Sequence, residues 1–205
     1  MLIRIYEENP DPRRVAQVVR FLRNGGVAIL PTDGVYTFTC DLANYRAFEK
    51  ICQLKGIRPE KADFSVLCSG LSHLSDFCQP ISTSTFKMLK RALPGPFTFI
   101  LHANNNVPRL FKSKKKTIGI RVPDNAIVQS IIAELGGPLV ATSVKHDDEI
   151  IEHSTDPELI NEKYLDRVDV VVDGGIGSLE ATTVVDCTGD SPEIIREGIG
   201  DISLI

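Results

Sequence analysis

The chain has 205 residues and a formal net charge of −4 at pH 7, with 42% hydrophobic and 24% charged residues. This composition is typical of a globular protein with a sizeable hydrophobic core, and it argues against an intrinsically disordered chain. The acidic balance also excludes nucleic-acid binding through overall charge, so any such binding would need a local basic patch.

The five cysteines are scattered and no pair has CxxC spacing, so we expect reduced thiols rather than a disulfide framework or a structural zinc site. The first residues lack the charged and apolar regions of a signal peptide. No apolar run approaches the ~20 residues that cross a bilayer. We therefore expect a cytoplasmic protein.

In the first half of the chain, the pattern predicts a short strand at 2–6 and then a helix that begins after Asp11 and ends at Gly25–Gly26. Asp11 can cap this helix and Pro12 suits its first turn. Its apolar residues recur at helical spacing: Val15, Val18, Val19 and Leu22. The further predicted elements are strands at 27–30 and 64–68, and helices from Asn44 to about Leu54, at 71–78 and at 82–92.

In the second half, strands are predicted within PGPFTFIL (94–101) and at 117–122 and 138–143, with a capped helix in DNAIVQSIIAELGG (124–137). A helix near 156–164 precedes three strands in VDVVVD, ATTVVDC and EIIRE. Strands and helices are intermixed without a linker or repeat. This order predicts an α/β fold in one domain over residues 1–205, with a twisted, mixed, open sheet flanked by helices.

Small hydroxyl residues occur at the ends of three apolar strands: Thr32 after VAIL, Thr142 and Ser143 after LVA, and Thr182 and Thr183 before VVD. Ligands in open α/β sheets bind at strand ends, and hydroxyls there can donate and accept hydrogen bonds. The alternative is that threonine is simply a good strand residue. The set as a whole favours a binding edge.

Positive charges form a second group. Lys55, Arg58 and Lys61 lie in one loop, Arg121 lies inside an apolar strand, and Arg196 ends the EIIRE strand. A buried arginine needs a partner, and a phosphate or carboxylate suits its bidentate geometry. A structural ion pair or a solvated surface is the alternative. Two other charged segments, FKSKKKT (111–117) and HDDE (146–149), are interpreted as exposed loops rather than RNA or metal sites.

Five motifs occur in order along the chain: LPTDGVYTFTCD, LPGPFTFIL, TIGIRVP, LVATS, and TTVVD followed by IIREG. They resemble the YrdC/YciO family, whose best-known members are L-threonylcarbamoyladenylate synthases, and the match is nearest to the YciO-like branch. The resemblance implies a twisted α/β fold around a positively charged cavity. It also implies condensation of L-threonine, bicarbonate and ATP, with Mg²⁺, to give threonylcarbamoyl-AMP and pyrophosphate for the t6A modification of tRNA.

By the same resemblance, Thr32, Thr142, Ser143 and Thr183 would bind the substrate amino acid, and Lys55, Arg121 and Arg196 would hold ATP and its phosphates. Two departures lie in this site. The loop Lys55-Gly56-Ile57-Arg58-Pro59 has one residue more than the synthase pattern Lys-x-Arg-Pro, so Lys61 could substitute for Arg58. Lys145 stands where synthases have asparagine, and its ammonium could hold phosphate.

These departures leave three hypotheses open. The first is a threonylcarbamoyl-adenylate synthase or a relative with weak activity. The second is a protein of the same fold that binds nucleotide, double-stranded RNA or tRNA without efficient turnover. The third is an enzyme that adenylates a different small carboxylate.

Overall fold

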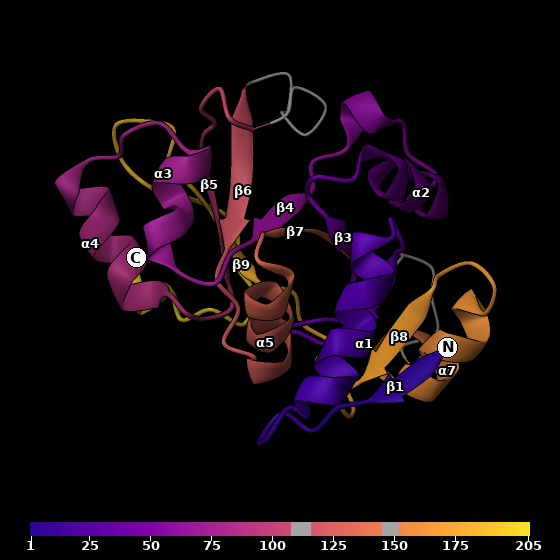
Figure 1. The fold of residues 1–205 in the computed structure, drawn as a ribbon. Coiled ribbons are helices and arrows are strands. Elements are labelled where there is room, and N and C mark those ends of the chain that lie inside the picture. Colours follow the sequence, from indigo (N-terminus) through magenta and orange to yellow (C-terminus); the bar gives the residue numbers. More distant parts are fainter. Residues whose placement is uncertain (108–115, 145–151) are drawn as a thin grey trace.

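The computed structural model describes residues 1–107, 116–144 and 152–205 (Figure 1). Lys145, the HDDE segment and most of FKSKKKT lie outside these residues. The described strands form one ten-stranded sheet in the order β1-β8-β2-β3-β7-β4-β6-β5-β9-β10. The sheet contains parallel pairs, such as β4 with β6, and antiparallel pairs, such as β3 with β7. This confirms the predicted α/β fold with a twisted, mixed sheet.

The strands are, in chain order, β1 (Leu2–Arg4), β2 (Ala28–Leu30), β3 (Thr37–Asp41), β4 (Ser65–Leu67), β5 (Phe97–His102), β6 (Thr117–Arg121), β7 (Leu139–Ser143), β8 (Val170–Asp173), β9 (Thr183–Asp186) and β10 (Glu193–Arg196). The helices are α1 (Pro12–Arg23), α2 (Tyr45–Lys55), α3 (Leu74–Phe77), α4 (Thr83–Ala92), α5 (Ala126–Leu135), α6 (Glu152–Thr155) and α7 (Pro157–Tyr164). Short 3₁₀ turns lie at Pro59–Lys61, Leu71–His73 and Ile202–Leu204.

The predicted helix caps are confirmed at the first two long helices. The Asp11 side chain accepts a hydrogen bond from the Arg13 amide, and Asn44 accepts one from the Ala47 amide. Helix α5 is capped by Asn125, whose Oδ1 accepts from the Val128 amide at 3.1 Å. These bonds satisfy backbone donors that each helix start would otherwise leave unpaired.

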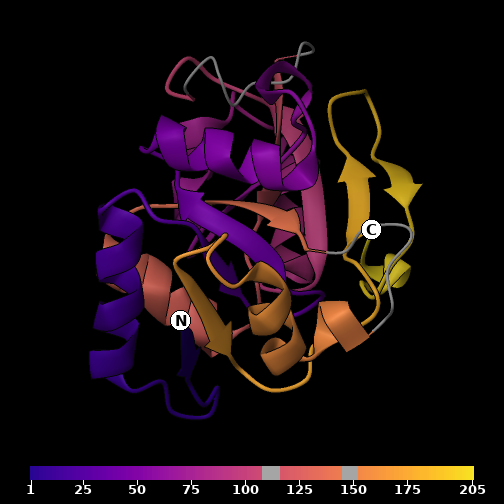
Figure 2. The ribbon, with the colours of Figure 1, turned by 90° about the vertical axis from the view of Figure 1, so that its right-hand side faces the viewer.

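Two hydrophobic cores lie on opposite faces of the sheet. Helices α1 and α5 pack side by side (Figures 1 and 2) and cover one face through apolar residues such as Val18 and Ile131. The other core contains Phe38, Phe97 and Phe99 from the sheet together with helices α2 and α4. None of the helices in the described ranges is long and apolar enough to span a membrane.

One central strand was not predicted. Strand β3 lies between β2 and β7, within the stretch that sequence reasoning treated as a binding edge. Its alternating residues Thr37 and Thr39 are buried, and the Thr39 hydroxyl donates to the Ala28 carbonyl at 3.1 Å. The threonines of TFTCD therefore build the sheet, and the turn before them, residues 31–36, forms the polar edge.

The five cysteines are free thiols in the structure, and all but Cys187 are buried. Burial raises the pKa of Cys68 and Cys78 to about 12 and that of Cys52 and Cys187 to about 11, and it raises the pKa of Cys40 as well. A raised pKa leaves little reactive thiolate near neutral pH.

We therefore expect an aromatic disulfide reagent at about pH 8 to label the folded protein slowly, with Cys187 reacting first. Unfolding in denaturant should expose all five thiols and make the reaction fast. The measurement is the absorbance of the released thiol over time. Rapid labelling of several thiols in the folded protein would contradict the burial described above.

Candidate functional site

A partly exposed patch of small side chains lies on one face of strands β4, β5 and β6. Ser65 and Gly119 are paired across β4 and β6, and a Cβ at Gly119 would lie 3.3 Å from the Thr98 methyl group of β5. Helices α1 and α5 cover the neighbouring part of this face, at Leu67 and Leu139, and stop short of the patch. We call Ser65, Thr98 and Gly119 the floor, because their small side chains leave room above the sheet.

Arg121 lies at one end of the floor. It follows Gly119 by two residues on β6, so both point to the same face. Its Nη2 donates to Asp33 Oδ1 at 2.8 Å and to Thr32 Oγ1 at 3.3 Å. The side chains of Arg121 and Asp33 are only 6% and 7% exposed, so this ion pair is buried.

The Thr32 hydroxyl is already engaged within the protein. It accepts from the Gly34 amide at 3.1 Å and from Arg121, and it donates to the Val35 carbonyl at 2.9 Å. The structure therefore places this predicted substrate-binding residue beside the site, where its single proton is used to hold the 31–36 turn.

Arg196 approaches the same end from edge strand β10. Its Nη2 and Nε donate to the Thr182 carbonyl at 2.9 and 3.3 Å. Burial lowers the pKa of the Arg121 guanidinium, Asp33 opposes this shift, and the positive charge of Arg196 adds to the lowering. Arg196 is related to the floor by geometry as well, because it bonds the backbone of Thr182, whose hydroxyl lies 2.9 Å from the Thr98 hydroxyl.

The neighbouring threonines 182 and 183 have different surroundings. The Thr182 hydroxyl hydrogen-bonds the Thr98 hydroxyl of the floor at 2.9 Å. Thr183, the predicted substrate-binding residue, is fully buried and donates to the Gly200 carbonyl at 2.8 Å. Because alternate strand residues point to opposite faces, Thr182 lies on the floor side and Thr183 on the core side.

Lys55 and Ser143 meet at the other end of the floor. The Lys55 ammonium, at the end of α2, donates to the Ser143 carbonyl at 3.0 Å. Ser143 and its neighbour Thr142 are partly exposed at the end of β7. From the register of β6, β4 and β7, Arg121 and Ser143 are separated by about 13 Å along the strands and about 10 Å across them.

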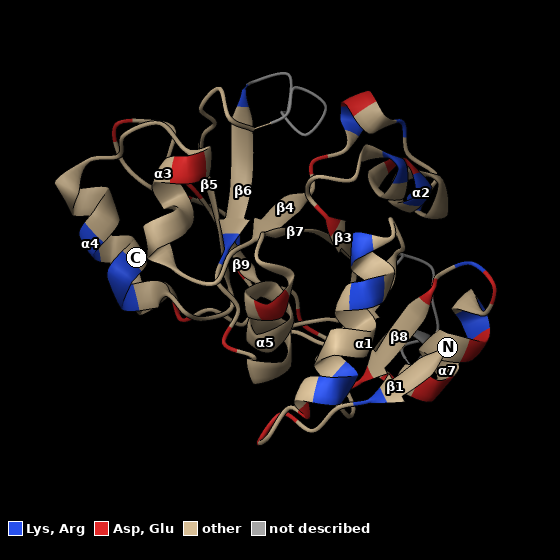
Figure 3. Cartoon of the chain, viewed as in Figure 1, with Lys and Arg blue, Asp and Glu red and all other residues tan. Residues whose placement is uncertain are grey.

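Two of the other predicted cations, Arg58 and Lys61, make no hydrogen bond or ion pair with these groups among the described residues. Arg58 and Lys61 are exposed at the two ends of the short turn after α2, and Lys145 lies outside the described residues. Helix α1 carries four arginines and no acidic residue (Figure 3), but all four are exposed on its outer side. Lys55, Arg121 and Arg196 are thus the predicted cations that border the floor.

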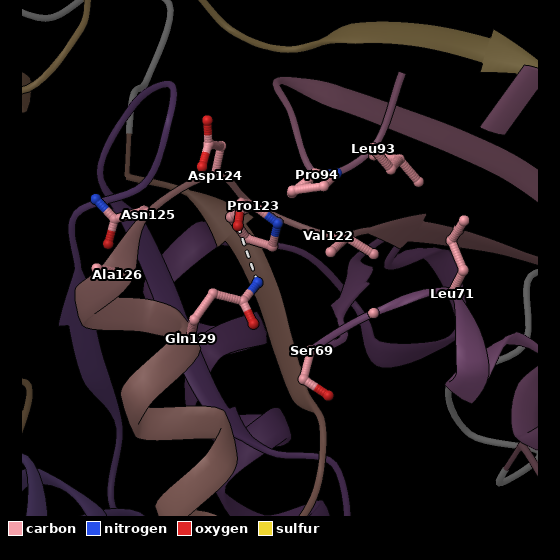
Figure 4. A pocket seen from close by; sticks show the side chains of 11 residues that line it. Ser69, Leu71, Leu93, Pro94, Val122, Pro123, Asp124, Asn125, Ala126 and Gln129 are labelled. Carbon is pink, nitrogen blue, oxygen red and sulfur yellow. Dashed lines mark hydrogen bonds between the residues drawn. The ribbon is translucent and has the colours of Figure 1, made fainter. Parts of the chain in front are cut away.

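A separate pocket of about 430 Å³ lies beyond the end of β6 (Figure 4). Its lining is mainly apolar, with Pro94 and Val122 on one side and the polar groups of Asn125 and Gln129 on another. The Gln129 amide is directed at the Pro123 carbonyl, 2.9 Å away. Arg121 is not among the residues that line this pocket, and its guanidinium turns toward Asp33, so the pocket is separate from the site.

Sequence reasoning missed Asp33 and the floor residues. Asp33 stands inside the quoted PTDG stretch, next to Thr32, and its isolated carboxylate beside a strand end was the available signal. The floor had no such signal, because Ser65, Thr98 and Gly119 come together only through strand pairing.

A family model described as "Telomere recombination", Sua5_yciO_yrdC, matches residues 20–198. The chain is similar to the protein YciO of Escherichia coli (strain K12), with 38% identity over 199 residues, 97% of this chain and 95% of that protein. The crystal structure of E. coli YciO matches with a TM-score of 0.92 at 35% identity and covers 100% of this chain and 98% of the other. The name of that relative assigns it no activity.

Other relatives have a named activity. The threonylcarbamoyl-AMP synthase of Halorhodospira halophila (strain DSM 244 / SL1) is 28% identical over 174 residues, 85% of this chain and 90% of that protein. The crystal structure of P. abyssi Sua5 complexed with L-threonine has a TM-score of 0.87 at 23% identity. It covers 97% of this chain and 57% of that chain, and it shows the same fold.

Proposed function

Because the chain belongs to the Sua5/YciO/YrdC family, we propose that it condenses L-threonine, bicarbonate and ATP to threonylcarbamoyl-AMP and pyrophosphate. The product would serve the t6A modification of tRNA. Relatives named threonylcarbamoyl-AMP synthase and the Sua5 structure with L-threonine support this choice of substrates.

The convergence of Arg121 and Arg196 at one end of the floor is the observation that carries the proposal. Asp33 balances one of these charges, whereas Arg196 has no ion pair with any residue that the structure describes. Lys55 adds a third cation at the other end. An excess of fixed positive charge beside an uncovered strand face suits a polyanionic ligand such as the triphosphate of ATP.

The proposed reaction forms two bonds. The threonine amine adds to bicarbonate with loss of water and gives a carbamate. A carbamate oxygen then attacks the α-phosphorus of ATP, and the bond to the β-phosphate oxygen breaks to release pyrophosphate. Such a transfer depends on alignment and on neutralising phosphate charge rather than on a nucleophilic side chain. Arg121, Arg196 and Lys55 would supply this neutralisation.

Magnesium would accompany ATP in this scheme. The described residues offer no cluster of three His, Cys, Asp or Glu side chains that could hold a metal ion. We therefore assign no protein ligand to Mg²⁺. The ion would enter as part of the MgATP substrate.

Pyrophosphate release from ATP tests the proposal directly. We expect release by the wild-type protein to require both L-threonine and bicarbonate, because the carbamate that attacks ATP contains both. The measurement is a coupled pyrophosphate assay in which each substrate is omitted in turn, with adenylate products identified by mass spectrometry.

Three outcomes would contradict the proposal. Release with another small carboxylate in place of threonine would favour a different adenylating enzyme. Release without bicarbonate would remove the carbamate step. ATP or double-stranded RNA binding without any release would favour a binding protein of the same fold, and RNA binding would weaken steeply with salt.

A further inference from the structure

Asp33 connects the 31–36 turn to the end of strand β6 through both of its carboxylate oxygens. Oδ1 accepts from the Arg121 guanidinium at 2.8 Å, and Oδ2 accepts from the Asp124 amide at 2.9 Å. The Asp33 side chain is 7% exposed, so water contributes little to either bond. No step of the proposed reaction uses this carboxylate.

The orientation of Arg121 depends on few contacts. Its Nη2 donates hydrogen bonds to Asp33 and Thr32. Both of these residues belong to the 31–36 turn, and the Gly34 amide of the same turn donates to the Thr32 hydroxyl. The Arg121 Nε is buried and has no hydrogen-bond partner among the described residues. Because the Nε–H is enclosed by the protein, the position of the guanidinium depends on the hydrogen bonds that anchor Nη2.

Asp33 also compensates the buried charge of Arg121. Without its carboxylate, the Arg121 guanidinium would be buried with no counter-ion among the described residues. A buried, uncompensated charge is costly, so the side chain would be expected to leave its position. The carboxylate therefore determines where the Arg121 charge lies.

We propose that Asp33 is a positioning residue for the nucleotide site, whose carboxylate holds the Arg121 guanidinium at the end of the floor, where its positive charge would meet the phosphates of ATP. The inference rests on the proposed function in that the ligand is ATP. We assign Asp33 no contact with ATP, because its side chain is only 7% exposed and both of its oxygens accept hydrogen bonds within the protein.

A structural role is the competing explanation. The bond to the Asp124 amide could matter simply because it fastens the 31–36 turn to the start of α5. Loss of Asp33 would then impair binding whether or not Arg121 were present. A double-mutant cycle separates the two explanations, because it measures how far the effect of one residue depends on the other.

The experiment measures ATP affinity by calorimetry for wild type, Asp33→Asn, Arg121→Met and the double variant. We expect Asp33→Asn to weaken ATP binding about tenfold, the scale of one charge-assisted hydrogen bond. In the Arg121→Met background, the same change should alter affinity less than about twofold, because no guanidinium remains to be positioned.

Asp169→Asn provides the matched control. Asp169 also bonds one cation and one backbone amide, with Lys50 Nζ at 3.0 Å and Val27 N at 2.8 Å, but it lies away from the floor. This variant should bind ATP as wild type does. Thermal unfolding of every variant establishes that binding is compared between folded proteins.

Two results would overturn the inference: wild-type affinity in Asp33→Asn, or an undiminished effect of that change in the Arg121→Met background. Absence of ATP binding by the wild-type protein would overturn it too. ATP binding without pyrophosphate release would instead contradict the proposed function alone, and the cycle would still report on Asp33.

If Arg121→Met abolishes measurable binding, nitrogen-15 arginine spectra give a second reading. The buried Arg121 Nε–H should exchange slowly with solvent in wild type and in Asp169→Asn and rapidly in Asp33→Asn. Equal exchange in all three would overturn the inference.

Discussion

The Lys55→Ala variant is expected to lower kcat/KM for pyrophosphate release about 100-fold, in the range seen when one preorganised charged or polar donor is removed from an active site. Lys55 is held at the end of α2 by its bond to the Ser143 carbonyl, so its ammonium is directed to the end of the floor. The substitution removes a fixed positive charge where phosphate charge must be neutralised. Steady-state kinetics with MgATP, L-threonine and bicarbonate measure the effect.

Lys50→Ala is the matched control for this prediction. Lys50 lies on the same helix and loses an ion pair with Asp169 when replaced, but it does not border the floor. Because both side chains of that pair are partly exposed to solvent, we expect little change in activity or stability. If the two variants lost activity equally, the effect would come from helix α2 as a whole, and the role proposed for Lys55 would be wrong.

Local patterns were sufficient to predict most of the fold. Helix α1 illustrates why: its cap, first-turn proline, apolar stripe and terminal glycines all lie within a few residues of one another. Each of these signals acts through local backbone chemistry, so the sequence alone contains the information. The same holds for α5, which was predicted to be capped and whose cap is Asn125.

Strand β3 shows where local patterns fail. Thr37 and Thr39 read as polar, and polar residues beside a proline and a glycine suggest a loop or a binding edge. In the structure, neighbouring strands β2 and β7 bury both threonines and pair the backbone between them. The alternation of β-branched and aromatic residues in Thr37-Phe38-Thr39 was a local signal for a strand, but the proline and glycine before it favoured a loop. Pairing with β2 and β7 decided the role of these residues.

The sequence was enough to predict which types of residue the site contains, but not which of them contact one another. Arg121 was expected to need an anionic partner, yet Asp33 lies 88 residues earlier in the chain. The choice between Thr182 and Thr183 required the phase of strand β9 relative to the sheet, which follows from its pairing with β5. The long-range pairing of strands therefore determines which of the candidate polar residues lie together at one edge of the sheet and what charge that edge carries.

The Phe38→Ala variant is expected to lose about 3–5 kcal/mol of unfolding free energy, which tests the central position of β3. Phe38 is fully buried, and its ring meets the Tyr164 ring edge-on at a centroid distance of 4.9 Å. Truncation removes this contact and leaves a cavity in the larger core, between two strands that carry parts of the site. Urea unfolding followed by circular dichroism measures the loss.

Phe86→Ala on helix α4 supplies the comparison, because it removes the same atoms from a side chain that is 42% exposed. Exposed substitutions of this kind usually change stability by about 0.5 kcal/mol or less. The difference between the two variants therefore isolates burial from the loss of an aromatic ring. Equal stabilities of the two variants would mean that Phe38 is not enclosed as described and that β3 does not hold β2 and β7 together. The 31–36 turn would then lack the support that places Asp33 against Arg121.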